Sequence, residues 1–467
     1  MQILPSYRAS ARHGPASLEL APFRGVRYAR DRVSGLAEVS SPPYDVIFRD
    51  NEDQLMAADP HNVVRLILPR PVAGQPGEEY RHAADSLRQW QDEGILIADP
   101  GPALYVYEQA AAAGASSNGQ GRDLRVSGGG NGGTRAGMIQ RGLIGALRLT
   151  PPDAGIVLPH EDVSPGPVAG RLQLMEATQA NLEPIFLLYD GGTPDEPGAT
   201  ARLVTATVAG QPLVEAITAD GVRHRLWALT DPGDLAAIAA DLAPRQALIA
   251  DGHHRYAAYL QLQDRRRRAG AGPGPWDYGL AMLVDSAAYP PRIGAIHRVV
   301  PDLDVHDAAK LAGAAFSVRS LPAGIADVPA AVSALADASA DGPAFVVADG
   351  EHAYLLTDPD PGQARAAMPA GQSAQWRALP ASVLQELLII QLWGLTDDEN
   401  TVRTVHHDAR AAVRTAQEAC GTAVLCSPMS PADVYAVAAR GEKVPRKSTS
   451  FAPKPRTGLV LRTFAQS

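Results

Sequence analysis

The chain has 467 residues, of which 45% are hydrophobic and 20% charged, a composition typical of a globular protein with a large core. This length favours two or three structural lobes over a single domain. The net charge of −9, from 51 acidic and 42 basic residues, excludes a global attraction to nucleic acid or to an anionic membrane, so any anion site must be local.

Cysteine content and hydropathy indicate the cellular compartment of the protein. Cys420 and Cys426 are too few for a disulfide framework, and their spacing fits no common zinc motif, so we expect free thiols in a reducing compartment. The stretch MQILPSYRASARHGP has no apolar signal segment, and no apolar run reaches the ~18 residues of a membrane helix. These features predict a cytoplasmic protein.

The first third of the chain mixes strand and helix patterns. The predicted strands are NVVRLILP (62–69), ALYVYEQ (103–109) and GMIQRGLIGALRL (137–149). Residues 78–94 repeat apolar side chains at helical spacing and stop at Gly94, a typical residue after a helix. The last two strands are expected to form a hairpin around residues 110–134, whose Gly, Ser and Asn content predicts a flexible insertion.

The rest of the chain alternates in the same way. Predicted strands cover 183–190, 224–230, 246–251, 278–285, 293–300, 343–348, 401–406, 421–426 and 457–464. Predicted helices cover 232–241 (with Asp231 as N-cap), 252–268, 328–338, 381–394, 408–418 and 430–440. This order predicts an α+β fold with mixed sheets. We expect an N-terminal α+β domain over 1–300 and a C-terminal α+β region over 301–467.

The richest polar cluster lies at a predicted strand–helix junction, ALIADGHHRYAAYL (247–260). Asp251 is expected to cap the helix, and Gly252 to permit the sharp turn before His253, His254 and Arg255. The free amides and the positive dipole end of a helix's first turn attract anions, phosphate above all. Arg255 is suited to a bidentate grip on phosphate oxygens. The competing interpretation is a capped helix with a surface histidine pair.

A second cluster, VPRKSTSFAPKPRTG (444–458), gathers cations near the end of the sequence. The cations are Arg446, Lys447, Lys454 and Arg456, and three prolines prevent a regular helix. Such charges repel one another unless an anion lies between them, which favours a phosphate ligand with Ser448 and Thr449 as hydroxyl donors. Solvated surface charge is the alternative. We expect this loop to return to the cluster at 251–255.

Three further stretches carry candidate residues. His160 and Glu161 adjoin a Pro/Gly-rich turn, where the carboxylate can act as general base or hold a divalent cation, or form a surface ion pair. Asp45 follows a rigid diproline and can position an amine or metal, or end a turn. Arg298 lies in an apolar strand, where a buried guanidinium needs a charged partner or a ligand.

Together these and other stretches resemble the family called domain of unknown function 1015 (DUF1015). The matching stretches are PPYDVI (42–47), NVVRLILP (62–69), TRAGMIQRGLIG (134–145), PHE (159–161), LMEATQANLEPIFLLY (174–189), IADGHHRY (249–256), HRVV (297–300) and VPRKSTSFAPKPRTGLV (444–460). The chain departs from the family at the Gly-rich insertion and at HEDVSPGP, which replaces a His-Glu-x-Thr-like pattern.

The stretch DGHHR is also similar to the phosphate-binding box of the ParB and sulfiredoxin superfamily. That resemblance implies a nucleotide-binding core around residues 246–268. Relatives in that superfamily bind nucleoside triphosphates, and some phosphorylate free serine.

These observations favour a phosphotransferase that uses ATP or ADP with Mg²⁺ on a small polar metabolite such as serine. The predicted catalytic residues are Asp251, His253, His254 and Glu161. The predicted nucleotide-binding residues are Gly252, Arg255, Lys447, Ser448, Thr449, Lys454 and Arg298. The predicted metal ligands are Asp251, Glu161 and His160.

Two alternatives remain open. One is a metal-dependent phosphatase or other hydrolase, which is disfavoured because adjacent histidines on a helix point about 100° apart. The other is a non-catalytic nucleotide-binding regulator. All three functions predict a small-molecule ligand, with neither nucleic acid nor membrane as partner.

Overall fold

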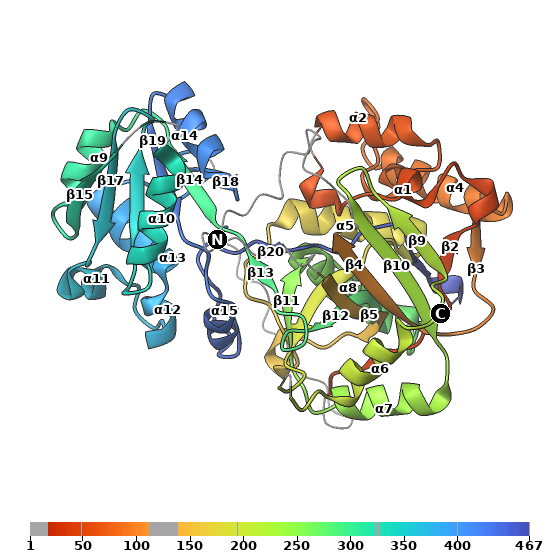
Figure 1. The fold of residues 1–467 in the computed structure, drawn as a ribbon. Coiled ribbons are helices and arrows are strands. Elements are labelled where there is room, and N and C mark those ends of the chain that lie inside the picture. Colours follow the sequence, from red (N-terminus) through yellow and green to blue (C-terminus); the bar gives the residue numbers. More distant parts are fainter. Residues whose placement is uncertain are drawn as a thin grey trace.

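The protein folds into two lobes, as a computed structural model shows (Figure 1). The structure describes residues 17–466 except 48, 112–138, 194, 323, 325–326 and 399. The insertion predicted at 110–134 therefore lies almost wholly outside the described residues. Among the helices that are described, none combines the length and the apolar character needed to cross a bilayer.

The larger lobe is built on a mixed sheet. Its strands are β1 (Leu20–Ala21), β4 (Leu104–Ala111), β5 (Ile139–Arg148), β6 (Val157–Leu158), β8 (Ile185–Tyr189), β9 (Val214–Ile217), β10 (Val222–Leu229), β11 (Ala247–Asp251) and β12 (Tyr278–Asp285). The order is β6-β11-β8-β12-β5-β4-β10-β9, with β1 beside β5. β6 pairs parallel with β11 and β8 with β12, while the other neighbours are antiparallel. The predicted α+β class with mixed sheets is confirmed.

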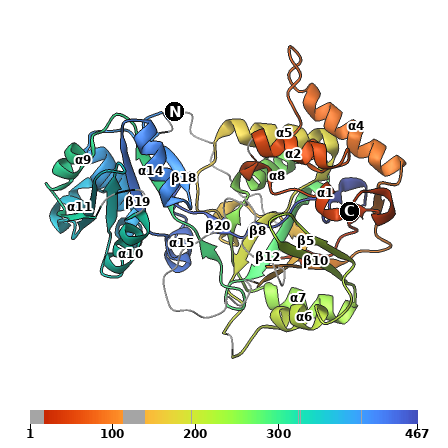
Figure 2. The ribbon, with the colours of Figure 1, turned by 45° about the horizontal axis from the view of Figure 1, so that its top comes forward.

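Helices cover one face of this sheet, and the end of the chain covers the other. The helices of the larger lobe are α1 (Leu36–Val39), α2 (Arg49–Ala58), α3 (Val64–Ile67), α4 (Glu78–Asp92), α5 (Pro165–Thr178), α6 (Ala199–Thr207), α7 (Pro232–Leu242) and α8 (His253–Arg268). Ile185 and Ile249 point to the face on which α5 and α8 pack side by side (Figure 2). Their neighbours Phe186 and Leu248 point to the opposite face, where Phe451 packs, as the alternation along a strand requires.

Three short strand pairs complete this lobe. They are β2 (Val26–Tyr28) with β3 (Leu96–Ala98), β7 (Ala180–Asn181) with β21 (Arg462–Thr463), and β13 (Arg292–Ile293) with β20 (Phe451–Ala452). Two of these pairs join the final residues of the described chain to its middle. The last strands therefore belong to the larger lobe although most of residues 301–467 do not.

The smaller lobe holds an antiparallel sheet between two layers of helices. Its strands, in sheet order, are β15 (Ser317–Leu321), β17 (Ala353–Thr357), β16 (Phe345–Ala348), β19 (Thr422–Cys426), β14 (Ile296–Val300) and β18 (Arg403–His406). Its helices are α9 (Val305–Ala312), α10 (Val328–Ala338), α11 (Pro361–Ala367), α12 (Ala374–Ala378), α13 (Pro380–Ser382), the π-helix η6 (Val383–Leu392), α14 (Ala409–Glu418) and α15 (Pro431–Ala438). α10 and α14 pack on one face, α9 and η6 on the other.

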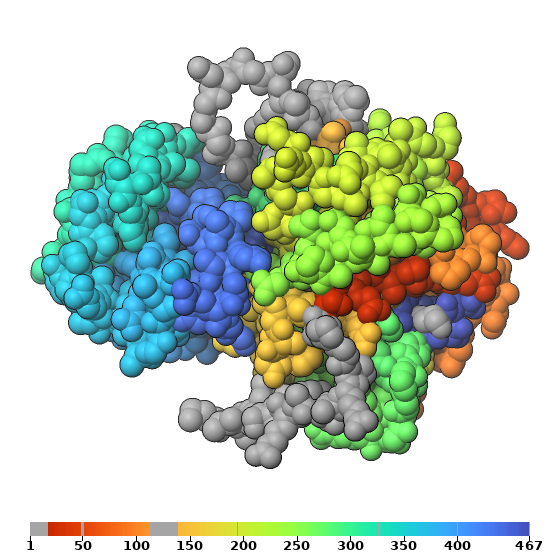
Figure 3. Space-filling model, turned by 90° about the horizontal axis from the view of Figure 1, so that it is seen from below, coloured from red at the N-terminus to blue at the C-terminus, as the bar shows by residue number. Residues whose placement is uncertain are grey.

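The chain crosses between the lobes at two places that lie side by side. One crossing follows β13 at Gly294, and the other is a segment that we call the seam loop, residues 444–456. The amide of Gly294 donates to the carbonyl of Ser450 at 2.8 Å. A Cβ at Gly294 would lie 1.7 Å from Nδ1 of His407, so a larger residue there would force the His407 ring to move. Seen from below, the two lobes meet along a continuous boundary (Figure 3).

Two predicted strands are wrong, and both errors have a physical reason. Residues 62–69 contain the short helix α3 rather than a strand. The side chain of Asn62 accepts from the amide of Val64 at 2.9 Å and starts the turn. Because Val64, Leu66 and Ile67 are all buried, the run is apolar on every side and its periodicity does not distinguish strand from helix. Residues 457–464 hold only the two-residue strand β21.

Two other elements differ in extent or were missed. The strand predicted at 293–300 is divided into β13 and β14, which pair in different sheets because the crossing at Gly294 separates them. The helix α5 was not predicted, since its first turn, PGPVAG, has the composition of a loop. Pro165 nevertheless occupies a first-turn position, where the missing N–H has no cost.

Candidate functional site

The strand–turn–helix junction after β11 is formed by Gly252. This residue has a left-handed φ of 95°, and a Cβ there would meet Cγ2 of Ile185 at 2.9 Å. The prediction that Asp251 caps α8 is wrong, because Gly252 is the N-cap and no side chain caps the helix. The first-turn amides of α8 are thus left without a side-chain cap, as an anion-binding helix start requires.

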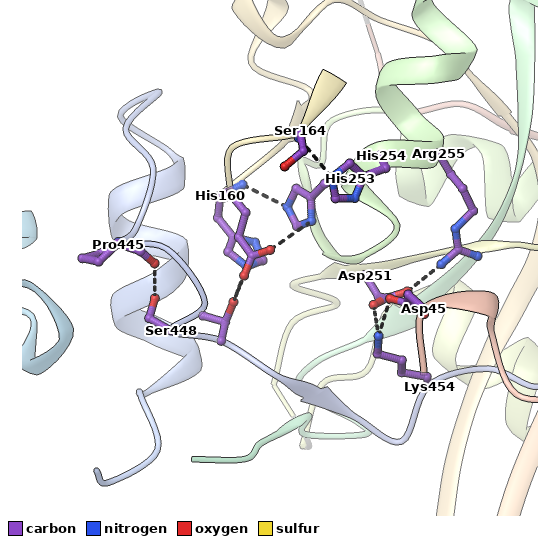
Figure 4. A network of polar contacts seen from close by, with 12 residues as sticks. Asp45, His160, Ser164, Asp251, His253, His254, Arg255, Pro445, Ser448 and Lys454 are labelled. Carbon is purple, nitrogen blue, oxygen red and sulfur yellow. Dashed lines mark hydrogen bonds and ion pairs between the residues drawn. The ribbon is translucent and has the colours of Figure 1, made fainter. Parts of the chain in front are cut away.

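The carboxylate of Asp251 instead takes part in a partly buried charge cluster (Figure 4). Its Oδ2 accepts from Nη2 of Arg255 at 2.6 Å, and its Oδ1 contacts the ammonium of Lys454. The same ammonium donates to Oδ2 of Asp45 at 2.7 Å. Lys454 belongs to the seam loop, so that loop reaches the start of α8 and holds a cation between two carboxylates.

Burial and neighbouring charges shift the pKa values of the two carboxyl groups, Asp251 and Asp45, in opposite directions. Burial raises the pKa of Asp251 to about 6, and the neighbouring Asp45 adds to the rise against the opposing effect of Lys454 and Arg255. At Asp45 burial alone would raise the pKa, but Lys454 and Arg255 outweigh it and the pKa is lowered. One carboxylate therefore stays ionised while the other exchanges a proton near neutral pH, a pattern found in acid–base sites.

Arg255 points into the protein. Its Nη1 donates to the carbonyl of Pro184 at 2.8 Å, its Nη2 is bonded to Asp251, and the residue is 4% exposed. Its guanidinium carbon also lies 5.8 Å from the ring centre of Tyr44. Burial raises the pKa of nearby Glu183, although Arg255 and Arg171 oppose the rise. Arg255 thus orients Asp251, and the structure gives both its terminal nitrogens internal partners in place of the phosphate predicted from the sequence.

A second network joins the seam loop to the loop after β6. The hydroxyl of Thr449 donates to Oε1 of Glu161 at 2.7 Å and lies 2.8 Å from Nε2 of His160. Because that hydroxyl has one proton and the carboxylate can only accept, Nε2 of His160 must carry a proton and donate to Thr449. Burial lowers the pKa of His160, so its imidazole is neutral.

The two histidines of α8 face this second network. The amide of His160 donates to Nε2 of His253 at 3.3 Å, and the amide of Ser164 donates to Nε2 of His254 at 3.1 Å. Burial lowers the pKa of His253 and of His254, the former well below its ordinary value. Each ring is thus neutral, accepts at Nε2 and carries its proton at Nδ1.

Ser448, Lys447 and Arg298 were also predicted to bind the nucleotide. Ser448 donates to the carbonyl of Pro445 at 2.6 Å, and Lys447 is exposed with a left-handed φ of 51°. Arg298, predicted to bind a cofactor, is 3% exposed and donates to the carbonyls of Ile296 at 3.2 Å and Arg446 at 3.0 Å. Arg298 therefore ties the start of the seam loop to the smaller lobe.

The predicted metal ligands do not form one group. Among the residues that the structure describes, no three His, Cys, Asp or Glu side chains are arranged to hold a metal ion. Asp251 is bonded to Arg255 and Lys454, whereas Nε2 of His160 is bonded to Thr449. Oε2 of Glu161 is the oxygen that this arrangement leaves for a further ligand.

Three charged side chains of the site are partly exposed. Glu161 is 26% exposed, Lys454 20% and Asp45 34%, while the residues behind them are nearly buried. A separate small pocket of about 20 Å³, lined by Arg171, Glu183 and Arg255 among others, has room for one water-sized molecule. Sequence reasoning missed Glu183, whose only signal was an acidic residue directly before an apolar strand.

Comparisons with known proteins give a family but no activity. A family model described as "Protein of unknown function (DUF1015)" matches residues 20–123 and 132–381. The gap in this match lies inside the predicted insertion, and the match ends before the seam loop. A search of curated proteins finds no match.

Solved structures resemble the chain only weakly. Free serine kinase in complex with AMP is 14% identical, with a TM-score of 0.31 over 67% of this chain and 87% of that one. A conserved hypothetical protein from Pyrococcus furiosus is 14% identical, with a TM-score of 0.30 over 67% and 90%. SbnI from Staphylococcus aureus, with a C-terminal truncation, is 12% identical, with a TM-score of 0.32 over 66% and 82%. Likeness at this level carries no argument about the ligand.

Proposed function

Since the chain belongs to the family described as a protein of unknown function (DUF1015), to which no activity is assigned, we propose one from the chemistry of the site. We propose a nucleotide-dependent phosphotransferase that acts on a hydroxyl group of a small polar metabolite, such as serine. The observation that carries this proposal is the position of Lys454. A cation delivered by the seam loop lies between Asp45 and Asp251, at the uncapped start of α8.

The phosphate-binding half of the proposed site combines amides and cations. The amides of residues 252–254 and the ammonium groups of Lys447 and Lys454 would hold the phosphate tail of ATP or ADP. Phosphoryl transfer depends mainly on positioning and charge neutralisation, which these groups supply. In this role DGHHR works like the phosphate-binding box of the ParB and sulfiredoxin superfamily, with the nucleotide-binding core around residues 246–268. Ser448 stabilises the loop that carries Lys447.

The acid–base half of the proposed site uses carboxylates. Asp251, with its pKa raised by burial to about 6, exchanges a proton beside the phosphates, and Arg255 orients it. Glu161 lies on the acceptor side and takes the proton from the attacking hydroxyl. His253 and His254 border the same space as neutral donors.

Magnesium enters the proposal with the nucleotide. Mg²⁺ in such sites is bound by phosphate oxygens, water and one or two carboxylates, so it needs no group of three protein ligands. The exposed carboxylate of Asp45 is of the kind that it prefers. No step of the proposed reaction requires a metal ion bound to the protein in the absence of nucleotide.

Turnover with defined acceptors tests this function. The full-length protein is incubated with ATP, ADP or CTP, MgCl₂ and hydroxylated metabolites, and products are followed by ³¹P NMR. We expect a phosphorylated acceptor, and at least a hundredfold slower transfer in Asp251→Asn. The matched control is His352→Gln, since His352 is an exposed side chain of the smaller lobe bonded to Asp349.

Two results would contradict the proposal. Hydrolysis of phosphoserine with added metal but without nucleotide would favour a metal-dependent phosphatase. Nucleotide binding with no turnover of any acceptor would favour a non-catalytic regulator.

A further inference from the structure

We propose that Oε2 of Glu161 and the Nδ1–H of His253 form a subsite for a single hydroxyl group, and that Thr449 positions Glu161 for it. The two atoms are 4.0 Å apart and lie on different elements, the loop after β6 and the start of α8. The identification of this hydroxyl as the phosphate acceptor rests on the proposed function, whereas the subsite itself rests on geometry.

The tautomer of His253 follows from its surroundings. Its Nε2 accepts the amide proton of His160 at 3.3 Å, so this nitrogen carries no proton. The ring is 6% exposed, and a ring whose Nε2 accepts a hydrogen bond can carry its own proton only at Nδ1. A neutral ring protonated away from Nε2 presents N–H at Nδ1, which faces Glu161.

The distance between Nδ1 of His253 and Oε2 of Glu161 limits which ligand groups can bind between them. At 4.0 Å the nitrogen and the carboxylate oxygen are too far apart to bond directly, but one oxygen atom can lie about 2.8 Å from both. That oxygen must accept from Nδ1–H and donate to the carboxylate at the same time. An ether or ketone cannot donate and an ammonium cannot accept, so the fitting group is a hydroxyl, that of an alcohol or of a water molecule that the alcohol displaces.

Thr449 decides which oxygen of Glu161 is available. Its hydroxyl donates to Oε1 at 2.7 Å and is itself fixed by Nε2 of His160 at 2.8 Å. Of the three consecutive hydroxyl residues in the seam loop, Ser448 bonds to Pro445 and Ser450 lies 3.0 Å from Nε2 of His407. Thr449 therefore acts through Glu161 as a positioning residue, and it leaves Oε2 for the ligand.

The subsite gives the acceptor's proton a defined path in the proposed reaction. The alcohol proton moves to Oε2 of Glu161 while the alcohol oxygen forms a bond to the terminal phosphorus. The bond between that phosphorus and the bridging oxygen of the nucleotide breaks, and the shortened nucleotide leaves with the electron pair. The Nδ1–H of His253 stabilises the negative charge that develops on the attacking oxygen.

Pairs of ligands that differ by one hydroxyl test the subsite without turnover. The full-length protein is titrated calorimetrically with L-serine and L-alanine, ethanolamine and ethylamine, and glycerate and lactate. We expect the hydroxylated member of at least one pair to bind ten times more tightly or better. That preference should be lost in Glu161→Gln and Thr449→Val, and kept in Thr449→Ser and in the control His352→Gln, an exposed change in the smaller lobe.

The wild-type protein offers a second readout that does not depend on the folding of any variant. The ¹⁵N spectrum of the His253 ring should show protonation at Nδ1, and this resonance should shift when the preferred alcohol is added. Protonation at Nε2 would overturn the proposal. So would equal binding of both members in all three pairs.

The outcomes separate the subsite from the proposed function. Alcohol-dependent binding without phosphoryl transfer supports the subsite and contradicts the phosphotransferase. Phosphoryl transfer whose alcohol preference is unchanged in Glu161→Gln and Thr449→Val supports the phosphotransferase and overturns the subsite.

Discussion

At the scale of single residues, the site is organised by what Lys454 and Arg255 do to Asp251. A buried carboxylate is expensive to ionise, and here two cations from different segments offset that cost. Burial and the neighbouring Asp45 raise the pKa of this carboxyl group, and the two cations oppose that rise. The pKa of Asp251 is therefore set jointly by the start of α8 and by the seam loop.

A titration of Asp251 tests this joint control. In the wild-type protein we expect its carboxyl ¹³C resonance to titrate with a midpoint at about pH 6. Replacing Lys454 by Met removes a neighbouring cation and should move the midpoint upward by at least one unit. Lys310→Met, an exposed change on α9, is the control. An unchanged midpoint in Lys454→Met would show that the two groups do not interact.

A second prediction at this scale concerns the effect of Arg255 on stability and on nucleotide affinity. Because its guanidinium is buried and bonded to Asp251 and Pro184, Arg255→Met removes one of the two cations that contact the Asp251 carboxylate and should cost about 3–5 kcal/mol of unfolding free energy. Nucleotide affinity should fall at least tenfold because Asp251 is no longer oriented. Urea unfolding and calorimetry measure the two effects, and wild-type values for both would contradict this role.

The sequence located these residues but not their partners. The order Asp-Gly-His-His-Arg after an apolar run was enough to place a polar site at the end of a strand. It did not reveal that Arg255 turns inward, because that direction depends on Pro184 and Glu183, which come from a distant part of the chain. The tautomers of the histidines likewise depend on amides that only the folded loop after β6 provides.

At the scale of elements, turns and long apolar strands were predictable, and ambiguous apolar runs were not. The elements β8, β10, β11 and β12 lie where alternation and β-branched residues indicated them. The short helix α3 was mistaken for a strand, and β13 and β14 were mistaken for one continuous strand, because tertiary contacts, not local preference, decide those segments. The helix α5 was missed because its Pro- and Gly-rich first turn has the local preference of a loop.

The turn between β11 and α8 can be tested with a matched glycine. Gly252 and Gly270 both have positive φ, but only a Cβ at Gly252 would meet another side chain, Cγ2 of Ile185. Gly270→Ala should cost about 1 kcal/mol through backbone strain alone. Gly252→Ala should cost about 1–3 kcal/mol more because of the overlap. Equal losses in urea unfolding would mean that α8 shifts freely on the sheet.

His297 in the strand β14 should make the stability of the protein depend on pH. Burial lowers the pKa of His297 to about 4, and its Nδ1 accepts the amide proton of Cys426 at 3.2 Å. The unfolded chain therefore binds the proton more readily between pH 6.5 and 4, so stability is present above pH 6.5 and is lost as the pH falls through this window. The loss from this residue is at most about 3 kcal/mol.

His297→Gln isolates this contribution, since glutamine can still accept from the Cys426 amide. Urea unfolding at pH 7 and pH 4.5 should show a smaller loss in the variant than in the wild-type protein. A variant that loses as much stability as the wild type would assign the acid sensitivity to other groups.

At the scale of the whole molecule, the seam loop connects the two lobes to one site. Arg298 and His407 contact it from the smaller lobe, while His160, Glu161 and Asp251 contact it from the larger lobe. The sequence suggested that this loop returns to the start of α8, because its clustered cations needed an anionic partner. It did not suggest that carboxylates of the protein itself would fill part of that role.

The central claim is that Lys454, delivered by the seam loop to the start of α8, binds the phosphates of a nucleotide. Calorimetric titration of the full-length protein and of Lys454→Met with Mg–ATP and Mg–ADP tests it most directly. We predict one binding site per chain, at least tenfold weaker in Lys454→Met and unchanged in Lys310→Met, as expected for a charge-assisted bond of about 1.5–3 kcal/mol. Equal affinity in Lys454→Met, or no binding of either nucleotide at millimolar concentration, would contradict the account.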